Sequence, residues 1–253
     1  MMRSLLPALV LFVPAFAQNK DKPKDPPPKP LYSFQLAVEP GKPTKLTIRG
    51  LRLDTATDIR VQEPKSTGKV LGKGRKSAVG NQQSADVVGD SEIDVEVTVP
   101  PEVAGGLLAI SLIGPGGESK PCAVAINDDT PRLAEKEPND GFKEAMPLTV
   151  PVVVTGGFKQ AQDADVFKFE AKAGEEYAIS VQAKRLGSPA DVLLSLYNAD
   201  QRVIATGEAR EDNPDPALTV KIPKDGPYFI SLLEGNDQGG NNFNYRLIVR
   251  KTK

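Results

Sequence analysis

The sequence has 253 residues with no histidine, no tryptophan and one cysteine, and its 32 basic and 33 acidic side chains give a formal net charge of -1. The lack of histidine excludes imidazole bases, Ser-His and Cys-His nucleophiles and the usual zinc ligand sets. One cysteine excludes an intrachain disulfide, and the evenly mixed charges exclude a basic stripe of the kind that binds nucleic acid.

Residues 1–17 have the features of a signal peptide. Arg3 precedes an apolar run, residues 5–16, that is too short to span a bilayer, and Ala15-Phe16-Ala17 has the small-x-small pattern of a signal-peptidase site. The residue that follows is Gln18 rather than a lipoprotein cysteine, and no later stretch is long and apolar enough to anchor the chain. We therefore expect an exported protein, secreted or periplasmic, without a membrane span.

Residues 18–30 predict a disordered tether. The segment "NKDKPKDPPPKP" consists almost entirely of Lys, Asp and Pro and has no apolar side chain to bury. Such a composition favours a flexible, partly polyproline-like chain.

Residues 31–129 alternate apolar and polar side chains in short runs, which predicts strands. In the clearest run Ile93, Val95, Val97 and Val99 face one side, and in "PCAVAI" the alternation makes Cys122 a small buried residue. The expected strands are residues 45–53, 58–61, 91–100, 107–114 and 122–126. With Gly and Pro at the turns, this rhythm predicts an immunoglobulin-like β-sandwich.

Two stretches of this region resemble the immunoglobulin-like IPT/TIG domain. They are "GKPTKLTIRGLRLDTATDIRV" and "EIDVEVTVPPEVAGGLLAISLIGPGGES", with an early strand that ends in Gly-x-x-Leu and a late "VPPEVAGG" turn. The resemblance implies a spacer or interaction module without chemistry of its own.

Residues 132–253 contain eight further candidate strands and no helical pattern. One side of each strand is apolar, as with Phe167 and Phe169 or Leu247 and Val249. The pattern predicts a second, jelly-roll-like sandwich, so the whole chain is expected to be all-β with two β-sandwich domains in tandem. Antiparallel pairing is expected because no crossover helices separate the strands.

The segment "EKEPNDG", residues 135–141, lies between the two predicted domains and is rich in oxygen ligands. In an extended chain Glu135 and Glu137 point the same way, and the following turn can bring Asn139 and Asp140 to the same side. Carboxylate and amide oxygens suit calcium, and the nearby "DADVFKF" provides Asp163 and Asp165 as further ligands. The competing interpretation is an ordinary turn within a hydrated linker, because Asn, Asp and Gly dominate turns.

The order of these motifs resembles the bacterial pre-peptidase C-terminal domain, a family that includes collagen-binding domains of clostridial collagenases. "EKEPNDGFKEAMPL", "DADVFKF" and the closing "GPYFISLLEG" carry the resemblance across residues 135–250. The resemblance implies a calcium site made by Glu135, Glu137, Asn139, Asp140 and Asp165. Gln162 stands where some relatives have another acidic ligand, so the site is expected to be weaker or completed by water.

The sequence therefore predicts a non-catalytic exported accessory or adhesion protein with a calcium-stabilised sandwich. Its expected partner is an extracellular protein or polysaccharide, including a secreted protease or a cell-envelope component, and no catalytic residue is predicted. A carbohydrate-binding module is one alternative, although five Tyr and no Trp offer few stacking platforms and most of the Tyr lie on strands. A hydrolase that uses paired carboxylates is the other alternative.

Overall fold

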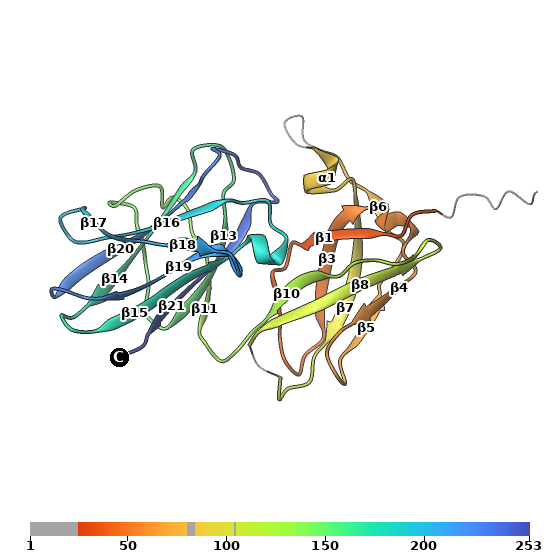
Figure 1. Cartoon of the computed structure of the whole chain (residues 1–253), viewed down its shortest axis with the longest axis horizontal. Helices are drawn as coiled ribbons and strands as arrows, with labels where there is room; N and C mark the ends of the chain where they lie inside the picture. Colours follow the sequence, from red (N-terminus) through yellow and green to blue (C-terminus); the bar gives the residue numbers. More distant parts are fainter. Residues whose placement is uncertain (1–24, 80–83, 104) are drawn as a thin grey trace, which may run out of the picture.

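The computed structural model describes residues 25–79, 84–103 and 105–253, so the predicted signal peptide and the first part of the predicted tether lie outside the described residues. The predicted all-β fold is confirmed (Figure 1): strands form four sheets, and α1 (Ala85–Val88) is the only α-helix among the described residues. None of the described helices has the length and apolarity needed to cross a membrane.

The first sandwich pairs two five-stranded sheets. One sheet consists of β1 (Lys29–Ser33), β3 (Thr44–Leu51), β5 (Thr67–Val70), β6 (Arg75–Lys76) and β7 (Ser91–Thr98). The other consists of β2 (Ala37–Val38), β4 (Asp58–Val61), β8 (Leu107–Gly114), β9 (Gly117–Glu118) and β10 (Cys122–Ile126). A 3-10 turn, η1 (Leu53–Thr55), follows β3.

Strand β7 shows how alternation builds this core. Ile93, Val95 and Val97 are fully buried between the sheets, whereas Asp94 and Glu96 face outward, where they pair with lysines of neighbouring strands. Period-two side-chain alternation therefore places one face of the strand in the core and leaves the other in water. Burial likewise raises the pKa of the Cys122 thiol to about 12, as expected for a small core residue.

The predicted tether ends earlier than residue 30, because β1 begins at Lys29 and pairs with β3. The residues just before it also contact the sandwich: the Arg52 Nε–H donates to the Pro27 carbonyl at 3.1 Å. A Cβ on Gly116 would lie 2.2 Å from the Asp25 carbonyl oxygen, so the chain is packed there. The composition of these residues indicates that they cannot form a hydrophobic core of their own. It does not indicate that they can pack against the surface of the first sandwich.

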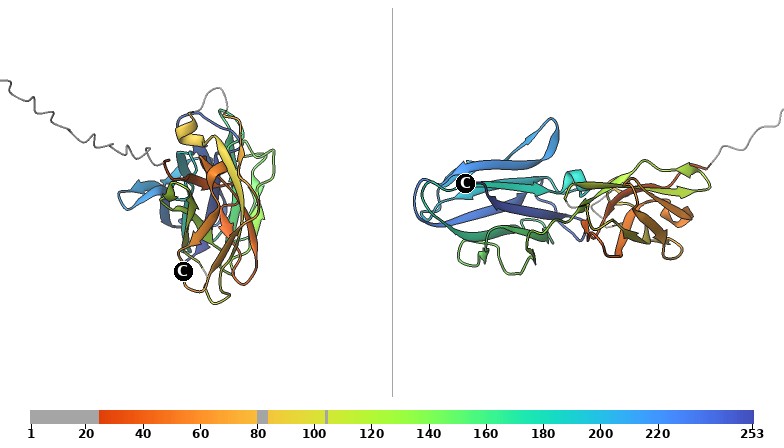
Figure 2. Two further views of the ribbon diagram at one scale, coloured as in Figure 1. Left: turned by 90° about the vertical axis from the view of Figure 1, so that its right-hand side faces the viewer. Right: turned by 90° about the horizontal axis from the view of Figure 1, so that it is seen from below.

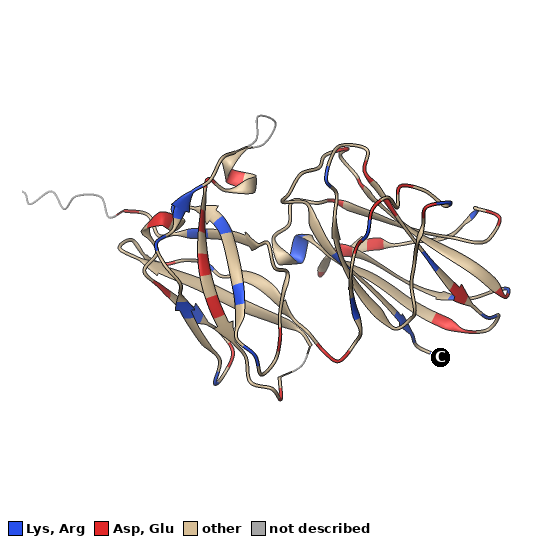
Figure 3. Cartoon of the chain, turned by 180° about the vertical axis from the view of Figure 1, so that it is seen from behind, with Lys and Arg blue, Asp and Glu red and all other residues tan. Residues whose placement is uncertain are grey.

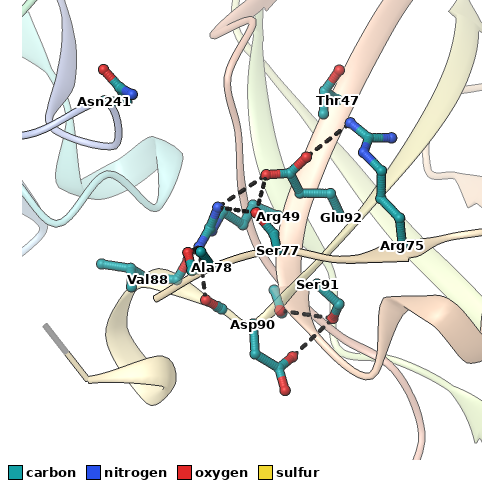
Figure 4. Close-up of polar contacts among 12 residues, drawn as sticks. Thr47, Arg49, Arg75, Ser77, Ala78, Val88, Asp90, Ser91, Glu92 and Asn241 are labelled. Atoms are coloured by element: carbon teal, nitrogen blue, oxygen red, sulfur yellow. Dashed lines mark hydrogen bonds and ion pairs between the residues drawn. The ribbon is translucent and has the colours of Figure 1, made fainter. Parts of the chain in front are cut away.

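A buried arginine, Arg49, fixes the segment that carries α1 (Figure 4). Its guanidinium donates to the carbonyls of Ala78, Val88 and Gly89 and to Ser77 Oγ, and it pairs with Glu92 at 2.9 Å. All five N–H groups therefore have acceptors, and the charge has a carboxylate partner.

The second sandwich pairs a six-stranded and a five-stranded sheet. The six-stranded sheet consists of β11 (Arg132–Ala134), β13 (Val152–Gly157), β21 (Asn244–Lys251), β15 (Glu176–Gln182), β19 (Asn213–Lys221) and β18 (Glu208–Arg210). The other sheet consists of β12 (Met146–Pro147), β14 (Ala164–Ala171), β20 (Gly226–Glu234), β16 (Val192–Tyr197) and β17 (Val203–Thr206). A second 3-10 turn, η2 (Lys184–Leu186), follows β15.

The expectation of antiparallel pairing is wrong for three short edge pairs. Strands β2, β11 and β12 pair in parallel with β10, β13 and β14, respectively. From β11 to β14 the chain alternates between the two sheets, so a strand of the opposite sheet lies between each strand and its parallel partner. That strand serves as the crossover connection, and no helix is needed. The other pairings between named strands are antiparallel.

Aromatic side chains occupy the centre of the second sandwich. Phe158, Phe167, Phe169 and Phe243 are at most 1% exposed. The prediction that most tyrosines belong to the core is confirmed, since all except Tyr197 are buried.

The two sandwiches lie in line along the long axis of the molecule (Figure 2). A small apolar cluster of Leu36, Ala125 and Leu186 joins them, because Leu186 belongs to η2 of the second sandwich. Ion pairs of Arg132 with Glu39 and of Arg250 with Asp128 add polar contacts at the junction. Elsewhere basic (blue) and acidic (red) residues are interspersed along the ribbon of both sandwiches (Figure 3), which agrees with the near-zero net charge.

Candidate metal centre

Three carboxylates meet where the chain enters the second sandwich. Glu135 directly follows β11 and is held by its backbone N–H, which donates to the Thr155 carbonyl at 2.9 Å. Asp165 faces inward from β14, and Glu137 lies two residues beyond Glu135. One oxygen from each of these three carboxylates lies within 4.8 Å of the other two. We call Glu135, Glu137 and Asp165, with Asn139, the acidic cluster.

Glu135 is oriented by three donors. The Gly157 backbone N–H donates to its Oε2 at 3.0 Å, the Asn139 Nδ2 donates to its Oε1 at 3.1 Å, and the Tyr245 hydroxyl lies 2.6 Å from the same Oε1. A Cβ on Gly156 would be 2.7 Å from Glu135 Oε2 and 2.6 Å from the Tyr245 hydroxyl oxygen. Glycine is therefore required for the carboxylate to approach β13 this closely.

Asn139 connects the loop to β14 and is fully buried. Its carbonyl accepts the Val166 N–H at 2.9 Å, and its own N–H donates to Glu137 Oε2 at 3.1 Å. Its Oδ1 and the Asp165 Oδ1 are both buried and have no hydrogen-bond partner among residues 25–79, 84–103 and 105–253. Buried oxygens seldom lack a partner, since leaving one unsatisfied costs about 1–3 kcal/mol, so both are open to a cation.

The cluster has more negative charge than its surroundings balance. No lysine or arginine nitrogen lies within 4.0 Å of Glu135, Glu137 or Asp165 among the described residues, and the Tyr245 hydroxyl has one proton to share between Glu135 and Asp165, which it contacts at 2.6 and 2.7 Å. Burial, followed by the charge of Glu135, raises the pKa of Asp165 far above its usual range. Burial and Glu135 also raise the pKa of Glu137. Burial and mutual repulsion therefore favour a bound proton at these carboxyl groups.

The structure brings together four of the five predicted ligands but not Asp140. The Asp140 side chain is exposed and is not among the carboxylates that lie within 4.8 Å of one another. Adjacent residues of this stretch face opposite ways, and Asn139 takes the inward position because its carbonyl is bonded to Val166. The other acidic candidate, Asp163, is buried but accepts the backbone N–H of Lys159.

Two residues of the site were missed by sequence reasoning. Tyr245 was interpreted only as a core residue of the last strand, and Gly156 was not considered. No local signal identifies either one, because their roles depend on β13 and β21 meeting at Glu135, 21 and 110 residues away along the chain.

These features define an all-β protein whose second sandwich is closed at one end by an acidic, oxygen-rich cluster. Residues 163–233 match the family profile described as the bacterial pre-peptidase C-terminal domain. The matched range begins at Asp163 and therefore includes Asp165 and strands β14 to β20, but not the Glu135 to Asn139 part of the cluster.

Among curated proteins, the chain is similar to a probable subtilase-type serine protease of Deinococcus radiodurans, with 31% identity over 103 residues. The aligned stretch is 40% of this chain but only 14% of that protease. Among solved structures, the pre-peptidase C-terminal domain of a Bacillus anthracis collagenase aligns over all of its own chain and 46% of this one, with 18% identity and a TM-score of 0.36. The Aeromonas hydrophila periplasmic inhibitor of g-type lysozyme aligns over 98% of its chain and 48% of this one, with 13% identity and a TM-score of 0.33.

Proposed function

We propose that the protein is a non-catalytic, exported accessory or adhesion protein whose second sandwich is stabilised by a calcium ion. The observation that carries the proposal is the acidic cluster: within the described part of the chain, three carboxylates converge with no basic partner, and two buried oxygens have no hydrogen-bond partner. Glu135, Glu137, Asn139 and Asp165 would hold the ion. Asp140, which is exposed, would act through its negative charge rather than as a direct ligand.

Calcium fits this set of donors better than other common ions. All available ligands are carboxylate or amide oxygens, which hard cations prefer, and the lack of histidine and the distance of Cys122 from the site disfavour zinc. Magnesium requires tighter octahedral geometry and retains more water. The bound ion would supply the positive charge that no residue of the described ranges places beside Glu135 and Asp165.

The rest of the proposal concerns the whole chain. The first sandwich would act as an IPT/TIG-like spacer, and the apolar segment of residues 5–16 would direct export. The match to the pre-peptidase C-terminal family and the similarity to part of a subtilase-type protease support an accessory role beside a secreted protease or another extracellular partner. A carbohydrate-binding role has less support, because four of the five tyrosines are buried and unavailable for stacking.

Calcium-dependent unfolding tests the proposal. Thermal unfolding is measured by calorimetry in chelator and with increasing calcium, for the wild type, Glu137→Gln and the control Glu170→Gln, whose exposed side chain lies on β14 outside the cluster. With a Kd near ~10⁻⁴ M, ~10 mM calcium would stabilise the native state by about 2.7 kcal/mol.

We expect the wild type and Glu170→Gln to gain this stability and Glu137→Gln to gain much less. Magnesium at the same concentration should have a smaller effect. If calcium leaves the wild type unchanged, or stabilises Glu137→Gln equally, the cluster is not a calcium site.

A further inference from the structure

A small pocket lies between the two sandwiches, on the outer face of the six-stranded sheet. Arg246, Ile248 and Arg250 alternate along β21 and therefore share this face. The first sandwich lines the other side of the pocket with the Gly105–Gly106 turn, Ile126 and Asp128, and the pocket volume is about 170 Å³. A Cβ on either glycine would meet nothing within 4 Å, so the turn borders open space.

Arg246 is the unusual group in this pocket. It is 5% exposed, and its guanidinium donates to two neutral acceptors, Gln182 Oε1 at 2.8 Å and Asn127 Oδ1 at 2.6 Å. No carboxylate oxygen lies within 4.0 Å of it among the described residues. A buried charge without a partner of opposite sign is costly, so this arrangement calls for an explanation.

The one other arginine of the described chain that is more than nine-tenths buried does not share this property. Arg49, also more than nine-tenths buried, pairs with Glu92 at 2.9 Å (Figure 4), and the partly buried Arg185 pairs with Asp215 at 3.0 Å. The fold therefore supplies a carboxylate to each of these guanidinium groups but only amide oxygens to Arg246.

The charges around the pocket leave one positive charge over. Of the charged residues that line it, Arg250 is paired with Asp128, so these two groups balance each other. Arg246 remains, and its burial lowers its pKa to about 10. One negative charge placed beside Arg246 would balance the charged residues that line the pocket.

We propose that this pocket is a binding site for a carboxylate-bearing ligand, with Arg246 as its charge partner. Arg250 provides a second guanidinium at the site, and Ile126, Val153 and Ile248 provide an apolar wall for the carbon atoms next to the carboxylate. At about 30 Å³ per water molecule, the pocket holds some five to six waters, which matches a carboxylate with a few carbons. The proposal does not depend on calcium, because its residues belong to the opposite face of the sheet from Tyr245.

The test uses propionate and its uncharged isostere propionamide, titrated into the protein and followed by the NMR amide shifts of Gly105, Gly106 and Ile126. The decisive variant is Gln182→Glu, which is nearly isosteric and places an internal carboxylate beside Arg246. Arg246→Gln removes the positive charge, and Arg210→Gln, on the exposed edge strand β18, is the matched control.

We expect saturable binding of propionate with a Kd in the millimolar range, no binding of propionamide, and at least ten-fold weaker binding in both Gln182→Glu and Arg246→Gln. The control should bind like the wild type. Gln182→Glu should also unfold at a higher temperature than the wild type, which distinguishes charge compensation from damage to the fold. Unchanged propionate binding in Gln182→Glu, equal shifts with propionamide, or no saturable shift in the wild type would each overturn the proposal.

Three peptides identify the source of the carboxylate once propionate binds. They are acetyl-Ala-Ala-Val with a free carboxyl end, the same peptide as its amide, and acetyl-Ala-Asp-Ala-amide. If only the peptide with a free carboxyl end binds, the carboxylate comes from a chain terminus. If the Asp-containing peptide binds, it comes from an acidic side chain. If none of the three peptides binds, the ligand is a free small acid. Because no arm contains calcium, failure here leaves the calcium proposal standing, and the reverse also holds.

Discussion

Replacement of Asp165 by asparagine should stabilise the metal-free protein, although Asp165 is buried at the centre of the acidic cluster. Its folded-state pKa is raised far above the ordinary value of 3.8 by burial and by Glu135, so near neutral pH the folded state binds a proton that the unfolded state does not. The stability contributed by this group is therefore present below pH 4 and is lost as the pH rises. At about 1.4 kcal/mol per pH unit, the loss between pH 4 and pH 7 approaches roughly 4 kcal/mol.

Asparagine has nearly the same shape and no proton to lose, so Asp165→Asn avoids this cost. Allowing for relaxation of the site, we expect the metal-free variant to be roughly 1–3 kcal/mol more stable than the wild type at pH 8, with the two converging near pH 4. With saturating calcium the order should reverse, because the variant has lost a charged ligand.

Calorimetry in chelator at pH 4, 6 and 8 measures both effects, with Asp200→Asn, an exposed turn residue of the same sandwich, as the control. Leu194→Ala, in the core of the second sandwich, identifies which transition belongs to that sandwich. If metal-free Asp165→Asn is less stable than the wild type at pH 8, or if its stability depends on pH as steeply, the carboxylate is not strained and the reasoning is wrong.

Three further changes follow from the structure. Gly156→Ala should cost about 2 kcal/mol or more and abolish calcium stabilisation in the same calorimetric assay, because its Cβ would lie 2.6 Å from the Tyr245 hydroxyl oxygen; an unchanged calcium response would contradict this. Phe142→Ala should cost about 1–3 kcal/mol in denaturant unfolding, since it removes edge-to-face contacts with Tyr197 and Phe229 at 5.1 and 5.2 Å; Phe142→Leu should cost less. Cys122 should react with a thiol reagent at pH 8 only after unfolding, because it is buried and its pKa is raised to about 12; rapid labelling of the native protein would contradict its burial.

Strands with strong alternation were predictable, and short edge strands were not. Residues 91–100 were predicted as a strand and form β7 (Ser91–Thr98). In an extended strand alternate residues share one face, so the apolar residues are buried together when that face packs against the core. In contrast, β11 (Arg132–Ala134) has three exposed residues and exists only because β13 offers a parallel edge. Its own sequence contains no signal, since the hydrogen-bond partner lies some twenty residues away.

The candidate site likewise contains some residues that local sequence patterns predict and others that they do not. Spacing alone placed Glu135 and Glu137 on one side of the chain, and the nearby "DADVFKF" segment offered Asp163 and Asp165, of which the resemblance implied Asp165. The choice of Asn139 over Asp140 for the buried position depends on a hydrogen bond to Val166, which belongs to another strand. The pocket around Arg246 was not predicted, since it forms only where the two sandwiches meet.

Strand β21 connects the two proposed sites and allows them to be tested against each other. Tyr245 faces the acidic cluster and the next residue, Arg246, faces the opposite side, so one strand lies between an excess of negative charge and an excess of positive charge. Asp165→Asn and Gln182→Glu each remove one imbalance by a nearly isosteric change, and each should stabilise the ligand-free protein. If the two sites are independent, their effects on the free energy of unfolding should add within about 0.5 kcal/mol in the double variant. A double variant that is markedly more stable than the sum would mean that the opposite charges attract through the sheet, because each single substitution would then have removed the same favourable interaction, which the double variant loses only once.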